Sequence, residues 1–68
     1  MESEAREIAS QKIRELGDDP ESYSVQVEEH GAAWRVIFLP LERRIRGGGY
    51  EVTVDKQTRE VQDVRRYQ

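Results

Sequence analysis

The chain has 68 residues, contains no cysteine, and carries a formal net charge of −3 at pH 7. This length is enough for one small domain, spanning residues 1–68, and too short for two. The lack of cysteine excludes disulfides, thiol nucleophiles and thiolate metal sites. No apolar run approaches the length of a membrane span and the first residues are polar, so the sequence predicts no membrane partner and a cytoplasmic location.

The charge is unevenly distributed along the chain. Residues 1–30 hold nine acidic and three basic side chains, whereas residues 31–68 hold eight basic and five acidic ones. Nucleic-acid-binding domains usually carry a basic excess throughout, which this chain lacks. The simpler interpretation is that the two halves attract each other; steering of a charged partner is the alternative.

A helix is predicted over residues 3–16. Its apolar side chains recur at helical spacing and form one stripe: Ala5, Ile8, Ala9, Ile13 and Leu16. Ser3 is expected to cap the first turn, and Gly17 to end the helix. The alanines on this stripe favour close packing against a flat partner, which we expect to be a β-sheet.

Four strand-like segments follow the helix, at residues 23–28, 33–39, 50–55 and 60–67. Residues 29–31 predict a hairpin turn, and Asp55 is expected to bind the backbone of the turn at residues 55–59. In the last segment Val61 and Val64 are three residues apart, which predicts a β-bulge near Gln62 or Asp63. The order predicts an α+β fold, with one N-terminal helix packed on a four-stranded antiparallel meander sheet.

The predicted core consists of the apolar residues that the helix and sheet would share. Trp34 is expected to be the position most sensitive to truncation, because it is the largest of them. The full set is Ile8, Ile13, Leu16, Val25, Val27, Trp34, Val36, Phe38, Val52 and Val54.

The sequence predicts no enzyme active site and no cofactor or metal site. His30 is the only histidine, and its place beside Gly31 is typical of a solvated turn. The acidic pairs at residues 18–19 and 28–29 fall at the ends of elements, where water keeps carboxylates ionised. The glycines at residues 47–49 precede a strand rather than a helix, unlike those of a phosphate-binding loop.

One face of the second strand keeps apolar side chains that the helix does not cover. An exposed apolar strip of this kind commonly marks a protein interface. The alternative is that the loop over residues 41–46 folds back and covers the strip itself. The candidate partner-binding residues are Ile37, Leu39, Leu41, Arg43, Arg44, Ile45 and Arg46, and the expected partner is another protein or a second copy of this chain.

Binding of nucleic acid or another polyanion is the alternative function. The arginines at positions 43, 44 and 46 precede a run of glycines, as in basic segments that follow a phosphate backbone. Tyr50 is placed to stack on a base. Arg65, Arg66 and Tyr67 extend the basic group if the last strand pairs beside the third, as a meander predicts.

Three parts of the sequence together resemble a known family: Trp34-Arg35-Val36, the glycines at 47–49, and the segment Y-E-V-T-V-D-K-Q-T-R-E-V at residues 50–61. They resemble the C-terminal half of small cystatin-like domains, above all bacterial immunity proteins of nuclear-transport-factor-like fold and PepSY domains. Arg59 stands where the family pattern has a glycine in positive φ. The resemblance implies a non-catalytic domain that binds or restrains another protein, like an immunity factor or a protease propeptide.

Overall fold

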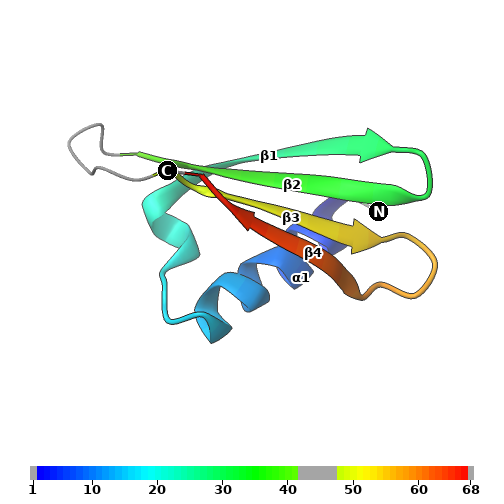
Figure 1. Cartoon of the computed structure of the whole chain (residues 1–68), viewed down its shortest axis with the longest axis horizontal. Coiled ribbons are helices and arrows are strands. Elements are labelled where there is room, and N and C mark those ends of the chain that lie inside the picture. The colour runs from blue at the N-terminus through cyan, green and yellow to red at the C-terminus, as the bar shows by residue number, and fades with distance from the viewer. Residues whose placement is uncertain (1, 42–47, 68) are drawn as a thin grey trace.

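The computed structural model describes residues 2–41 and 48–67 (Figure 1). The elements are helix α1 (Glu2–Glu15), the 3-10 turn η1 (Pro20–Ser22), and strands β1 (Tyr23–His30), β2 (Ala33–Pro40), β3 (Tyr50–Asp55) and β4 (Val61–Arg66). The strands pair in chain order as one antiparallel sheet, and α1 crosses one of its faces. The predicted α+β fold is therefore confirmed.

The side chains beneath α1 form the core. Cross-strand register brings Val27, Val36, Val52 and Val64 into one row across all four strands. On the helix, Ala5 and Ala9 are 2% and 0% exposed, which confirms the close helix–sheet contact that the small residues predict. The fully enclosed set is Ala5, Ala9, Ile13, Val36, Phe38, Tyr50, Val52 and Val54.

Several predicted core residues lie at the margin of this cluster. The half-buried ones pack against it from the edges: Ile8, Val25, Val27 and Trp34. The prediction for Leu16 is wrong, because its side chain is 50% exposed. The helix ends at Glu15, and Leu16 lies in the turn that Gly17 completes with a φ of +88°, so its side chain leaves the stripe.

The predicted turns are mostly confirmed. Asp55 Oδ1 accepts hydrogen bonds from the backbone N–H groups of Gln57 at 2.7 Å and Thr58 at 2.8 Å. The bulge in β4 is also present, since Thr53 pairs with Asp63 and Val54 with Val61, which leaves Gln62 unmatched.

Two local predictions differ from the structure. Residues 29 and 30 belong to β1, where they pair with Trp34 and Ala33, so the first hairpin turns through Gly31 and Ala32 alone. Ser3 lies inside the first helical turn rather than before it, because α1 begins one residue earlier than expected.

Candidate functional site

The sheet face opposite α1 is the open face. Because successive side chains of a strand point to opposite faces, the residues between the core positions lie there. Across the strands, Gln26, Ile37, Glu51 and Arg65 form one row of this face. The next row, towards the C-terminal end of β2, begins with Ser24 and Leu39.

Exposed apolar side chains gather at one end of the open face. Leu39 is 41% exposed, Leu41 63% and Tyr67 39%. The backbone N–H of Leu41 donates to the carbonyl of Ser22, which extends the pairing of β1 and β2 one step past β2. We call Ile37, Leu39, Leu41 and Tyr67 the loop-end patch.

Gly49 joins the two halves of this patch. A Cβ on Gly49 would lie 1.4 Å from the carbonyl oxygen of Phe38, so no other residue fits without moving β2. The carbonyl of Gly49 also accepts a hydrogen bond from the N–H of Tyr67 at 2.9 Å. Gly49 therefore sits between Leu39 and Tyr67 and adds no side chain to the face.

A polar network borders the patch and fixes Tyr67. The Tyr67 hydroxyl donates to Glu51 Oε1 at 2.7 Å, and Arg35 Nε lies 3.6 Å from the same oxygen. The hydrogen bond to Glu51 raises the pKa of the Tyr67 phenol above its ordinary value. Arg65 Nε pairs with Asp63 Oδ2 at 3.2 Å. The open face thus combines one apolar end with a border of paired charges.

The structure describes only part of the site that the sequence predicts. It places Ile37, Leu39 and Leu41 together on the open face. Arg43, Arg44, Ile45 and Arg46 lie outside the described residues. Tyr67 is also a member of the patch, whereas the sequence places it only in the alternative basic group with Arg65. The sequence indicates this position of Tyr67 by alternation, because residues two apart on a strand share a face and Tyr67 lies two residues after Arg65.

The structure contradicts one part of the polyanion hypothesis. Tyr50 is 4% exposed and lies in the core, so its ring is closed to a stacking base. Its hydroxyl donates to Asp18 Oδ2 at 2.9 Å, and the Arg66 guanidinium lies 5.3 Å from the ring centre. Arg65 does reach the open face, since β4 pairs beside β3 as expected.

Asp18 holds the segment after the helix against the sheet. Its Oδ2 accepts hydrogen bonds from the hydroxyls of Tyr23, at 2.6 Å, and Tyr50. The bond from Tyr23, followed by the bonds from the backbone N–H of Asp19 and from Tyr50, holds the pKa of Asp18 below its ordinary value. Burial, followed by the bond to Asp18, raises the pKa of both phenols. The sequence gives Asp18 only a helix-ending role, so its contact with Tyr50, 32 residues away, was not foreseen.

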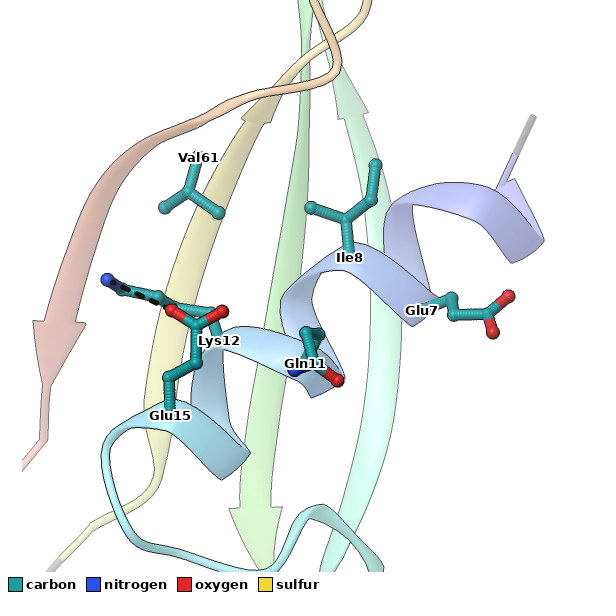
Figure 2. Close-up of a pocket in the computed structure, with 6 residues that line it drawn as sticks. All are labelled: Glu7, Ile8, Gln11, Lys12, Glu15 and Val61. Atoms are coloured by element: carbon teal, nitrogen blue, oxygen red, sulfur yellow. Dashed lines mark ion pairs between the residues drawn. The ribbon is translucent and has the colours of Figure 1, made fainter.

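A groove of about 480 Å³ lies between α1 and the start of β4 (Figure 2). Ile8 and Val61 line its two sides, and Lys12 reaches from the helix and pairs with Glu15 at 4.0 Å. Its carboxylates belong to exposed residues of α1, Glu7 and Glu15. Acid–base catalysis needs a carboxyl group held in an apolar enclosure, and this groove does not provide one.

Residues 2–41 and 48–67 contain no cluster of three potential metal ligands. In the same ranges no helix has the length and apolarity required to cross a membrane. Comparisons with known proteins find no matching family model, no similar curated protein and no similar solved structure. The resemblance to small cystatin-like domains therefore stays a prediction from the sequence motifs.

Proposed function

We propose that this domain is a non-catalytic protein-interaction module that binds another protein through the loop-end patch. The observation that carries the proposal is the exposure of Leu39, Leu41 and Tyr67 together at one end of the open face. Grouped apolar side chains of this kind cost free energy in water and favour a protein that covers them.

The border of the patch fits the same role. Protein interfaces commonly have an apolar centre and a polar rim. Here the rim consists of the pairs Arg35–Glu51 and Arg65–Asp63, which balance each other in charge. A partner that buries the patch therefore meets charges that already have partners, and it need not neutralise a net charge.

The resemblance suggests what kind of binding this is. An immunity or inhibitor protein acts by occupying a surface of its target, and needs a rigid, exposed face rather than a catalytic group. A sheet closed on one side by α1 and open on the other provides such a face (Figure 1). We place the interaction in the cytoplasm, as the sequence predicts.

A matched pair of variants tests the proposal. Leu39 and Leu16 are similarly exposed, at 41% and 50%, but Leu16 lies at the end of the helix layer. The wild-type domain, Leu39→Gln and Leu16→Gln are each immobilised and exposed to lysate of the source cells at physiological salt. We expect a stoichiometric protein that the wild type and Leu16→Gln retain and Leu39→Gln loses. Equal retention by all three variants would contradict the patch as the binding site.

Polyanion binding is kept as the second candidate because β4 brings Arg65 and the exposed Tyr67 ring to the same end of the open face. Arg65 is paired with Asp63, so a phosphate would have to displace a carboxylate. Phosphate contacts weaken steeply as salt rises, whereas an apolar interface does not. Nucleic acid recovered at low salt, and released by Arg65→Ala, would favour this candidate over the first.

A further inference from the structure

The two edges of the sheet differ in how they are protected. β4 has six residues, a bulge at Gln62 and three charged side chains. Bulges and charges are the features that keep exposed edge strands from pairing with other chains. β1 has eight residues in unbroken register with β2, and residues 23–27 carry no charge. Figure 1 shows no other element of the described chain beyond β1.

The backbone groups that β1 leaves free follow from its pairing with β2. The N–H of Leu41 donates to the carbonyl of Ser22, one step before the first pair of the same register. In an antiparallel pair, residues that bond the neighbour alternate with residues whose N–H and C=O point away. The even-numbered residues of β1 therefore bond β2. The outward-facing residues are Tyr23, Val25, Val27 and Glu29.

We propose that β1 pairs antiparallel with β1 of a second copy of this chain, around a two-fold axis at Gln26. The axis is perpendicular to the sheet, so both helices lie on the same face and the two sheets become one. Val25 then lies opposite Val27 of the second copy, and Tyr23 opposite Glu29 of the second copy. Val25 and Val27 are outward-facing residues, so each of their two pairs exchanges both backbone hydrogen bonds. In each Tyr23–Glu29 pair only the N–H of Glu29 donates across the axis, because the N–H of Tyr23 already bonds the carbonyl of Pro20.

Charge and burial select this register over its neighbours. Centring the axis on Val25 would place Glu29 opposite Glu21 of the second copy, and like charges directly opposite destabilise a pair of strands. Centring it on Val27 would place Val25 opposite a glutamate. The register at Gln26 instead joins the half-buried valines of both copies into one continuous apolar row.

Gln26 suits a two-fold axis. Its side chain is exposed on the open face, and at the axis it meets the same side chain of the second copy. The two Gln26 residues would form a pair without backbone hydrogen bonds to each other. In such a pair the two side chains lie closer together than in a hydrogen-bonded pair. A glutamine amide has both a donor and an acceptor, so two copies satisfy each other. This inference is independent of the proposed function, because it concerns the edge of the sheet and not the loop-end patch.

Sedimentation equilibrium from micromolar to millimolar protein tests the proposal. We expect a monomer–dimer equilibrium in the wild type. Gln26→Glu places two carboxylates against each other at the axis and should weaken the dimer at least about tenfold. Gln57→Glu makes the same charge change in the β3–β4 turn and should leave the dimer unchanged. A wild type that stays monomeric throughout, or equal weakening by both variants, would overturn the proposal.

Amide hydrogen exchange gives a second measurement that needs no variant. The N–H groups of Val25 and Val27 should be protected at high protein concentration and exchange rapidly at low concentration. The N–H of Gln26, which bonds β2, should be protected at both. Concentration-dependent protection of Val64 on β4, without any at Val25 and Val27, would assign the contact to the other edge and contradict the proposed pairing.

Discussion

Asp18 illustrates how one side chain can tie distant parts of a small fold together. Its carboxylate joins the end of α1 to the first residues of β1 and β3 through Tyr23 and Tyr50. We expect Asp18→Asn to lower the free energy of unfolding by about 1–2 kcal/mol, because two hydroxyls lose a charged acceptor. Asp19→Asn is the control, since an asparagine can still cap the turn that Asp19 caps through the N–H of Glu21.

The lowered pKa of Asp18 also predicts that the stabilisation by this residue depends on pH. The pKa of Asp18 is lower in the folded protein than the ordinary value of 3.8, so the unfolded chain takes up the proton first as the pH falls. The stabilisation by Asp18 is therefore present above the unfolded-state pKa of 3.8, and it is lost as the pH falls from there through the lower folded-state pKa. Urea unfolding at several pH values should show the wild type and Asp18→Asn converging in acid. A constant difference between them down to the folded-state pKa would contradict this role.

Arg59 occupies the left-handed region, with a φ of 63°, at the position where the resembled family has glycine. For a residue with a Cβ this conformation costs roughly 1–2 kcal/mol. Its Nε pairs with Glu4 at 2.7 Å, but the side chain is 69% exposed, and exposed pairs stabilise little. We therefore expect Arg59→Gly to raise the free energy of unfolding by about 1 kcal/mol. Arg59→Ala loses the same ion pair but keeps a Cβ in the left-handed conformation, so the backbone strain remains. Chemical denaturation should therefore show Arg59→Ala to be less stable than Arg59→Gly.

The position most sensitive to truncation follows from burial rather than from residue size. Phe38 is 0% exposed, whereas Trp34 lies at the margin of the core with Lys56 Nζ 4.8 Å from its ring centre. Phe38→Ala should cost about 3–5 kcal/mol, and Trp34→Ala less, because its cavity opens to solvent. Thermal unfolding of both variants decides the order. A larger loss for Trp34→Ala would restore the expectation drawn from the sequence.

At the scale of elements, the helix–sheet contact depends on two alanines. Ala9 is 0% exposed and faces the sheet, so a larger side chain would push α1 outward. We expect Ala9→Leu to destabilise the domain by about 1–3 kcal/mol through overpacking. Gln11→Leu, on the exposed side of the same helix, should change the free energy of unfolding by much less. Equal effects of the two variants in chemical denaturation would contradict the close contact.

The elements are also where the sequence was most informative. Apolar periodicity was sufficient to predict the helix, all four strands and their order, because each face that is buried carries a regular pattern. The spacing of Val61 and Val64 even indicated the bulge at Gln62. The exposure of Leu16 could not be predicted in this way, since it depends on where Gly17 turns the chain and not on the stripe itself.

The candidate site was less predictable than the fold. Alternation along β2 correctly placed Ile37 and Leu39 on the face away from the helix. The position of Tyr67 beside Leu39 depends on its backbone pairing with Gly48 and Gly49, which no local pattern reveals. The burial of Tyr50, in contrast, follows from alternation along β3, because Tyr50 shares the core-facing side of the strand with Val52 and Val54.

At the scale of the whole molecule, the domain is a two-layer structure with a protected side and an exposed side. Helix α1 closes one face of the sheet, and the loop-end patch remains on the other (Figure 1). The proposed pairing of β1 would double this open face and place two such patches on one surface. Each copy would then bind its partner independently, so loss of pairing should leave the patch able to bind.

The most direct test of the account is photo-crosslinking from within the patch. A photoreactive amino acid is incorporated at position 39 in one protein and at position 16 in another, and both are irradiated in lysate of the source cells. The account predicts one dominant protein adduct from position 39 and none from position 16. Adducts of equal yield from both positions, or a nucleic-acid adduct from position 39, would contradict the proposal that the open face binds a protein.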